Sequence, residues 1–154
     1  MDLCDLLTPD GVIASLKATN KKDALEQLAA AAAEKTGLDR LEIFNTLLQR
    51  ERLGSTGLGS GIAIPHVKLA GLTKIVCMFA RLTDPIEFDS HDDQPVDLVF
   101  LLLAPEHASG DHLKALASIS RLVREPSVID NLRKAPDAEA LRQTLTRTLP
   151  SHAA

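Results

Sequence analysis

The sequence predicts an α/β protein, a three-layer α/β/α sandwich around a central mixed β-sheet. Two strand candidates, residues 73–82 and 96–103, are apolar on both faces, so both faces of the sheet must be covered. Helical patterns before and after these strands supply a layer for each face. The 154 residues can bury one substantial core, and no linker divides them. We therefore expect a single domain over residues 1–150, with a short tail at 151–154.

The N-terminal part of the chain predicts one strand and a first helix. Residues 12–16 are a short strand candidate. Asn20 is a suitable N-cap for residues 21–35, in which alanine and leucine recur at helical spacing. Gly37 is a suitable end, because glycine accepts the left-handed conformation that follows many helices.

A second helix is predicted to begin after Asp39 and to end near Gly54. Asp39 and Glu42 form a capping-box-like start, in which the first side chain accepts a backbone N–H three residues later. The residues expected to face the core are Leu41, Phe44, Leu47 and Leu48. Both helices lead directly into a glycine-rich stretch.

The rest of the chain predicts strands followed by helices. Residues 62–64 are a short strand candidate that stops at Pro65, because proline has no N–H for a β-ladder. The acidic segment 84–95 predicts a surface connection, with a candidate small strand at 86–88. Three helices are expected to close the chain, at 110–124, 126–134 and 137–147. The second of these begins with proline, which is favoured at the first helical position.

Strand direction suggests where a site would lie. If the strands at 62–64, 73–82 and 96–103 run up, down and up, the first and third end at the same edge of the sheet. His66 follows the first and His112 follows the third. Ligands of α/β sheets tend to bind outside the carboxyl ends of strands. We therefore expect these two histidines, distant in sequence, to face one pocket.

Composition argues against nucleic acid as a partner. The chain has four phenylalanines and no tryptophan or tyrosine, so it lacks the aromatic platforms on which bases stack. Its formal net charge of -4 is also unfavourable for binding a phosphate backbone.

Cysteine usage and hydropathy predict a cytoplasmic protein. Cys4 and Cys77 are far apart and form no CxxC pair, as expected of free thiols in a reducing compartment. The first residues lack the basic and apolar regions of a secretory signal. No apolar run approaches the ~18–20 residues needed to span a bilayer, so we expect no membrane insertion.

The glycine-rich stretch at 54–61 holds four of the chain's eight glycines, yet it matches no nucleotide or hydrolase motif. A Walker loop needs lysine and then serine or threonine after the last glycine, where this chain has Ile62 and alanine. The dinucleotide fingerprint needs glycine at that position and a helix beyond it, which Pro65 excludes. Neither Ser55 nor Ser60 has the flanking glycines of a nucleophile elbow.

Metal binding is not supported by the histidine spacing. His107 and His112 are five residues apart, and His91 lies beside two aspartates. Neither arrangement gives the His-x-x-x-His or paired-cysteine spacing of a zinc site. We predict no metal and no cofactor, and we expect His91, His107 and His152 to be surface residues.

The segment from Arg50 to His66 resembles the active-site signature of enzyme IIA domains of the bacterial phosphotransferase system. It contains Arg-Glu, then Gly-Ser-Thr-Gly, then Gly-Ile-Ala-Ile-Pro-His. The resemblance is to the fructose–mannitol type and is nearest to its nitrogen-regulatory branch. It covers nearly the whole chain and includes Asp-His-Leu at 111–113. Val67 is a departure, because a small residue is common after the histidine, and it makes the rim slightly bulkier.

The resemblance implies that His66 accepts a phosphoryl group from a small HPr-like phosphocarrier protein. A neutral imidazole is a good nucleophile toward phosphorus. In phosphoryl transfer the protein contributes mainly positioning and charge stabilisation. Arg50 could donate charge-assisted hydrogen bonds to phosphoryl oxygens. Arg50 and His112 match the family's partners of the phosphorylated histidine.

The glycine-rich loop is the other expected part of the site. The hydroxyls of Ser55 and Thr56 could bind phosphoryl oxygens or only satisfy the turn backbone, and the sequence leaves both interpretations open. The loop glycines expected to let Arg50 and His66 meet one phosphoryl group are Gly57, Gly59 and Gly61.

The resemblance implies a regulatory function, in which phosphohistidine at His66 switches interactions with regulatory targets such as transporters, kinases or other regulators. A phosphoryl group adds ~1.5–2 negative charges and changes what a surface can bind. Two alternatives stay open. One is a sugar-specific component that passes the phosphoryl group to a IIB domain, and the other is a non-catalytic module that only binds a partner.

Overall fold

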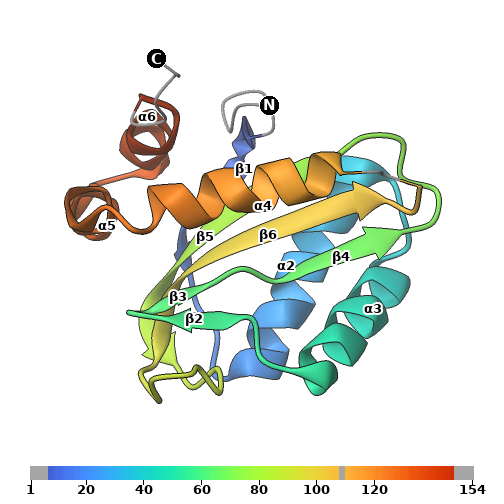
Figure 1. Cartoon of the computed structure of the whole chain (residues 1–154), viewed down its shortest axis with the longest axis horizontal. Coiled ribbons are helices and arrows are strands. Elements are labelled where there is room, and N and C mark those ends of the chain that lie inside the picture. The colour runs from blue at the N-terminus through green and yellow to red at the C-terminus, as the bar shows by residue number, and fades with distance from the viewer. Residues whose placement is uncertain (1–6, 108–109, 148–154) are drawn as a thin grey trace.

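A computed structural model describes residues 7–107 and 110–147. Over these residues the chain forms a sheet of six strands between two layers of helices (Figure 1). In chain order the elements are β1 (Leu7–Leu16), α2 (Lys21–Thr36), α3 (Arg40–Leu53), β2 (Gly57–Gly59), β3 (Ile62–Ala63), β4 (His66–Leu69), β5 (Val76–Ile86), β6 (Val96–Pro105), α4 (Asp111–Leu122), α5 (Pro126–Lys134) and α6 (Ala138–Arg147). Cys4, His152 and the predicted tail at 151–154 lie outside the described residues.

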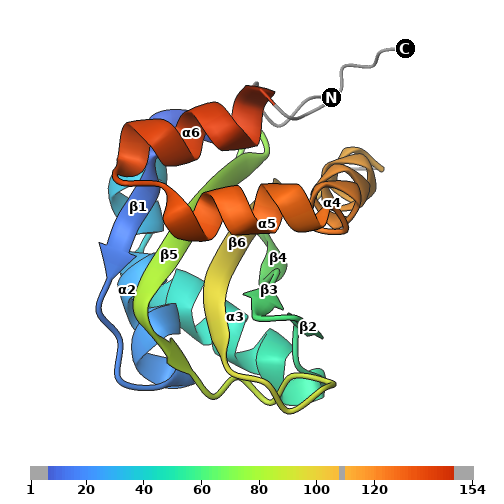
Figure 2. The same ribbon diagram turned by 90° about the vertical axis from the view of Figure 1, so that its left-hand side faces the viewer.

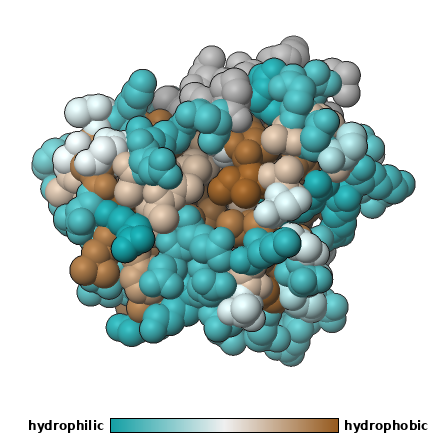
Figure 3. Space-filling view, turned by 180° about the vertical axis from the view of Figure 1, so that it is seen from behind, coloured by the Kyte–Doolittle hydropathy of each residue, from teal (hydrophilic) through white to brown (hydrophobic). Residues whose placement is uncertain are grey.

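The predicted fold class is confirmed. Helices α2 and α3 cover one face of the sheet, and α4, α5 and α6 cover the other, as a perpendicular view shows (Figure 2). Seen from behind, the protein surface is mostly hydrophilic, with apolar residues gathered in a few patches (Figure 3). Among the described helices, none is long and apolar enough to cross a membrane.

The sheet is mixed, with the strand order β1-β5-β6-β3-β2 and β4 also paired to β6. β5 runs antiparallel to β6, whereas β3 and β4 run parallel to β6. The predicted up, down and up directions are therefore confirmed. Pro65 ends β3 as expected, but pairing resumes at His66, which lies beside Leu102. The chain can continue along β6 because the Pro65 carbonyl still accepts a hydrogen bond from the Leu102 amide, at 2.9 Å.

Side chains of β5 and β6 alternate between two cores, as their sequences predict. Those that pack with α2 and α3 are Val76, Met78, Ala80, Val99, Leu101 and Leu103. Those that pack with α4, α5 and α6 are Cys77, Phe79, Leu98, Phe100 and Leu102. The Phe79 and Phe100 rings meet edge to face with centroids 4.9 Å apart. Apolar side chains cover both faces of the sheet, so a polar site is expected at its edge.

The predicted helix ends are confirmed for the N-terminal pair. The Asn20 side chain accepts a hydrogen bond from the Asp23 amide at 2.8 Å, and Asp39 does the same for Glu42 at 3.0 Å. Gly37 adopts a φ of 78°, in the left-handed region. These local signals set where α2 and α3 begin and where α2 ends.

Three predictions of detail are wrong. Leu41 is 62% exposed, and Ile43 is buried in the same helix instead, because the core-facing stripe passes through Ile43 and Phe44. No separate strand exists at 86–88, because β5 itself continues to Ile86 after a register shift. β1 begins at Leu7, earlier than predicted, because pairing with β5 extends it.

Candidate functional site

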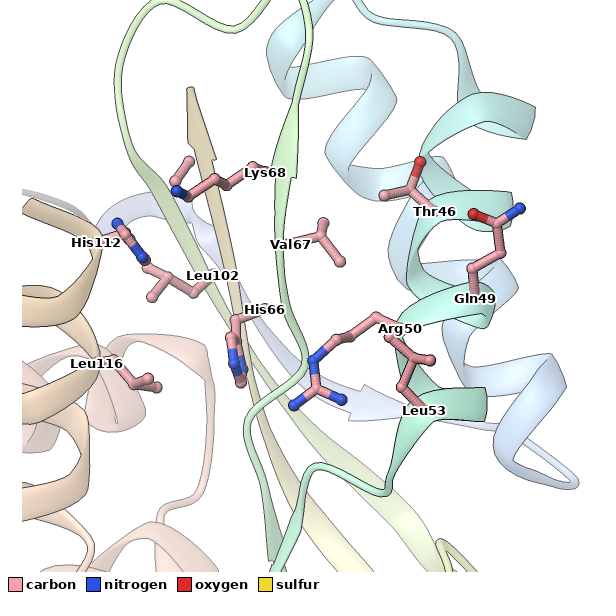
Figure 4. A pocket seen from close by; sticks show the side chains of 11 residues that line it. Thr46, Gln49, Arg50, Leu53, His66, Val67, Lys68, Leu102, His112 and Leu116 are labelled. Atoms are coloured by element: carbon pink, nitrogen blue, oxygen red, sulfur yellow. The ribbon is translucent and has the colours of Figure 1, made fainter. Parts of the chain in front are cut away.

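A groove of about 490 Å³ opens between the end of α3, the start of β4 and the start of α4 (Figure 4). Three elements distant in sequence thus contribute side chains to one cavity. The residues that line it are Thr46, Gln49, Arg50, Leu53, His66, Val67, Lys68, Leu102, Ala104, His112 and Leu116. This set contains the three residues expected to carry the chemistry and none of the predicted loop residues.

His66 opens β4 and is half-buried at the groove. Its Nδ1 lies 2.7 Å from the carbonyl oxygen of Ile64. A carbonyl oxygen can only accept, so Nδ1 carries the proton of the neutral ring and Nε2 keeps a free lone pair. The backbone therefore selects the tautomer in which Nε2 is the nucleophilic atom.

Arg50 lies in the last turn of α3, and its guanidinium extends toward His66 (Figure 4). Its Nη1 donates to the carbonyl oxygen of Gly54 at 2.9 Å. A guanidinium has five N–H donors, so this bond leaves others for a ligand. Arg50 thus satisfies the end of its own helix and also presents a positive charge to the groove.

His112 lies in the first turn of α4, on the far side of the groove from Arg50 (Figure 4). The expectation that His66 and His112 face one pocket is confirmed, since both line the same groove. The Nδ1 atom of His112 is buried and has no hydrogen-bond partner among the described residues.

The charge of the groove differs from that of the whole chain. Arg50 and Lys68 line it, and among residues 7–107 and 110–147 no aspartate or glutamate does, although the chain carries a net charge of -4. This arrangement suits an anion. Lys68 was missed because the sequence predicted that the strand stops at Pro65. In the structure β4 begins at His66, and residues two apart in a strand share a face.

Thr46 and Gln49 are two further polar residues of the groove that the sequence reasoning did not select. They lie on α3 at helical spacing from Arg50, so residues 46, 49, 50 and 53 share one face of that helix. Helical periodicity could have identified them once Arg50 was chosen.

Ser55 and Thr56 do not line the groove. The Ser55 hydroxyl donates to the carbonyl of Phe88 at 2.6 Å and accepts from the Gly57 amide at 3.0 Å. Thr56 is buried, and both its hydroxyl and its amide donate to the carboxylate of Glu51. Both hydroxyls therefore have partners within the protein: Ser55 bonds to the backbone of Phe88 and Gly57, and Thr56 bonds to the Glu51 carboxylate.

The predicted loop glycines also lie away from the groove. A Cβ at Gly57 would meet Ser90, and one at Gly59 would lie 3.1 Å from Oδ2 of Asp92. A Cβ at Gly61 would meet Arg133 and Asp97. The glycines therefore allow the segment around residues 90–97 and helix α5 to approach the loop closely.

The other candidate nucleophiles are unsuitable. Cys77 is fully buried, and burial raises the pKa of its thiol to about 12, so the reactive thiolate is suppressed. His91 and His107 are exposed, as expected, and do not line the groove. Two histidines, His66 and His112, line the groove, and His66 is the one whose Nδ1 lies against a backbone carbonyl oxygen.

The fold and the groove place the chain in a known class. It belongs to the EIIA 2 family of the phosphoenolpyruvate-dependent sugar phosphotransferase system, whose family model matches residues 5–148. The predicted resemblance to enzyme IIA domains is confirmed.

Relatives named as nitrogen regulatory proteins and one named as a fructose-specific component both match nearly the whole chain. The chain is 54% identical to a nitrogen regulatory protein of Bradyrhizobium diazoefficiens over 145 residues, which cover 94% of this chain and 95% of the relative. Its fold matches the crystal structure of nitrogen regulatory protein IIA-Ntr from Neisseria meningitidis with a TM-score of 0.89 and 34% identity, over 94% and 99% of the two chains. A fructose-specific EIIA component from Haloferax volcanii is 33% identical over 97% of this chain and 99% of its own.

Proposed function

We propose that His66 accepts a phosphoryl group from an HPr-like phosphocarrier protein. The observation that carries this proposal is the hydrogen bond between His66 Nδ1 and the Ile64 carbonyl, at 2.7 Å. It leaves the lone pair on Nε2, in a groove that also contains Arg50 and His112. The family assignment supports phosphoryl transfer as the chemistry.

The proposed step needs no general base. The Nε2 lone pair of His66 attacks phosphorus, the N–P bond of the donor phosphohistidine breaks, and the donor imidazole leaves with that electron pair. The ring of His66 gains positive charge as the new N–P bond forms. Its Nδ1–H stays bonded to the Ile64 carbonyl, whose fixed dipole stabilises that charge without reorganisation.

The cations of the groove would hold the phosphoryl oxygens. Arg50 can donate charge-assisted hydrogen bonds, and Lys68 adds positive charge at the rim. His112 offers a ring N–H from the opposite wall. Phosphoryl transfer depends mainly on such positioning and charge stabilisation, and these three side chains supply both.

Phosphorylation of His66 would act as a regulatory signal in the cytoplasm. It adds ~1.5–2 negative charges to a groove whose described charged residues are Arg50 and Lys68, so the unmodified and modified groove favour different partners. The names of the relatives as nitrogen regulatory proteins support this function. We propose transporters, kinases or other regulators as the class of targets.

A second candidate function is transport. The fructose-specific EIIA relative from Haloferax volcanii covers the whole of this chain within a few residues. In that case His66 would pass the phosphoryl group to a sugar-specific IIB domain instead of holding it as a signal.

The test is incubation with a phosphorylated HPr-type carrier, followed by intact-mass analysis. We expect one phosphoryl adduct that is labile in acid and stable in base. His66→Ala should abolish it, whereas His91→Ala and His107→Ala, which change exposed histidines, should keep it. An unmodified wild-type protein would refute the proposal and favour a module that only binds a partner. An adduct on His66→Ala would refute His66 as the acceptor. Rapid transfer onward to a sugar-specific IIB domain would favour transport.

A further inference from the structure

Glu51 is a buried carboxylate directly after Arg50 in the last turn of α3, and it does not line the groove. It is 7% exposed. Its oxygens accept hydrogen bonds from the amide of Thr56, at 3.0 Å, and from the Thr56 hydroxyl. Lys21, at the start of α2, lies 3.0 Å away. A buried carboxylate is destabilising unless it is paired and hydrogen-bonded, and these donors meet that need.

The bonds of Glu51 close a short turn that contains the hydrogen-bond partner of Arg50. The carboxylate of Glu51 holds Thr56, and its carbonyl accepts the Gly54 amide at 3.2 Å. The Gly54 carbonyl in turn accepts Nη1 of Arg50 at 2.9 Å. The Gly54 carbonyl oxygen, which orients the Arg50 guanidinium, therefore lies in a turn that Glu51 holds at two points. The Glu51 carbonyl binds the Gly54 amide, and the Glu51 carboxylate binds Thr56.

A second layer of contacts braces this turn. Lys21 Nζ lies 3.4 Å from the Phe88 carbonyl oxygen and 4.6 Å from the centroid of the Phe88 ring. The same carbonyl accepts the Ser55 hydroxyl at 2.6 Å. The start of α2, the end of α3 and the segment after β5 thus meet at one polar cluster.

From this geometry we infer that Glu51 is a positioning residue for Arg50, acting through Thr56 and the Gly54 carbonyl. The inference rests on the proposed function, in which Arg50 holds the phosphoryl group. Loss of the Glu51–Thr56 bonds frees the turn, and Arg50 then loses a fixed partner. Because displacement of a catalytic group by about 1 Å can slow a reaction by about 100-fold, a looser turn is sufficient to impair transfer.

The variants Thr56→Val and Thr56→Ser test this inference with nearly unchanged side-chain shape. The first removes the hydroxyl that Glu51 accepts, and the second keeps it. We expect Thr56→Val to slow phosphoryl uptake from a phosphorylated HPr-type carrier by about tenfold or more, and Thr56→Ser to restore most of the rate. Glu51→Gln weakens the same contacts, because glutamine offers one acceptor oxygen in place of two and cannot form an ion pair with Lys21. Ile43→Val, a buried change in the same helix, should lower stability without slowing uptake.

A double-mutant cycle separates positioning from general destabilisation. If Thr56 acts through Arg50, then Thr56→Val should not slow uptake further once Arg50→Ala is present, although it should still lower the melting temperature. Additive slowing in the double variant would overturn the inference.

The side-chain Nε–H signal of Arg50 in a ¹H–¹⁵N NMR spectrum provides a readout that does not depend on transfer. In the wild type we expect the signal of an ordered Arg50 side chain. In Thr56→Val and Glu51→Gln the signal should shift and show a more mobile side chain, and in Thr56→Ser it should resemble the wild-type signal. If the wild type takes up no phosphoryl group, the proposed function fails, and this signal still decides whether Glu51 positions Arg50. An Arg50 signal that is unchanged in both Thr56→Val and Glu51→Gln would overturn the inference.

Discussion

The two halves of the segment from Arg50 to His66 differ in what surrounds them. The glycine half, residues 54–61, is tied to other parts of the protein: Ser55 bonds to Phe88, and the glycines leave room for side chains of residues 90–97 and of α5. The histidine end opens into the groove. A glycine-rich loop beside an active site therefore need not bind the ligand, because close packing between segments requires glycine as much as a phosphate cradle does.

The largest effect on the histidine side, apart from loss of His66 itself, is expected from Arg50→Ala. Removing one preorganised donor to a charged transition state typically slows a reaction by about 10²–10³-fold. Arg50→Lys should retain part of the rate, because it keeps the charge but loses the planar fork. Single-turnover uptake from a phosphorylated carrier measures both. Arg52→Ala changes an exposed neighbour in the same helix and should leave the rate unchanged. If Arg50→Ala took up the phosphoryl group at the wild-type rate, Arg50 would have no part in the transfer.

On the glycine side, the largest effect is expected from Gly61→Ala. Gly61 and Gly37 have nearly equal φ values, 82° and 78°, so alanine is strained at both positions by about 1–2 kcal/mol. At Gly61 the added Cβ would also meet Arg133 and Asp97, whereas at Gly37 it would meet nothing within 4 Å. Because those two groups are the far ends of partly exposed side chains, displacing them should add no more than the ~1 kcal/mol that their ion pair contributes.

Urea unfolding of the two glycine variants compares these losses, and phosphoryl uptake should be nearly unchanged in both. Equal losses of stability would show that close packing is not what requires glycine at position 61. If Gly61→Ala took up the phosphoryl group slowly but kept its stability, the loop would be part of the functional site after all.

A smaller loss of stability is expected from Arg133→Ala. Arg133 pairs with both carboxylate oxygens of Asp97, at 2.9 and 3.0 Å, and donates to the Ser60 carbonyl at 2.8 Å. The pair is partly exposed, so we expect a loss of about 1 kcal/mol in urea unfolding. Arg142→Ala, which breaks an exposed pair with Glu139 within one helix, is the matched control and should lose less. If the two losses were equal, the link between α5 and the loop would contribute nothing of its own.

The smallest effect concerns pH and Asp92. Hydrogen bonds from the amides of Ser60 and Gln94 lower the pKa of Asp92 below its ordinary value of 3.8. Folding therefore favours the ionised form, so this stabilisation is present at neutral pH and is lost as the pH falls below 3.8 through the lowered pKa. Asp92→Asn should melt at a lower temperature than the wild type at pH 7. The difference should disappear toward about pH 2, and a difference that is constant with pH would contradict this account.

Local and periodic features of the sequence were sufficient for most of the fold. The caps at Asn20 and Asp39 and the left-handed Gly37 follow from hydrogen bonding and backbone sterics within a few residues. The two-sided apolar strands required cover on both faces, and strand parity placed His66 and His112 at one groove. Each of these features depends on neighbouring residues or on a regular repeat along the chain. They could therefore be predicted without knowing which distant segments are in contact.

Contacts between distant segments could not be read in this way. Ile43 faces the core where Leu41 was expected, because the packing of α3 on the sheet selects the buried stripe. β1 starts at Leu7 because β5 lies beside it. Ser55 has Phe88 as its partner, 33 residues away, and nothing in the local pattern names that residue.

The sequence by itself determined the α/β/α class and the family signature, and it predicted His66 as the reactive residue, because residue chemistry and periodicity are local properties. Tertiary structure decided the rest of the site. It selected the Nδ1–H tautomer of His66 through Ile64, brought Arg50 and His112 to opposite walls, and turned Glu51 away from the groove. These features depend on where carbonyl and carboxylate oxygens lie in space, and only the packing of α2, α3 and α4 against the sheet fixes those positions.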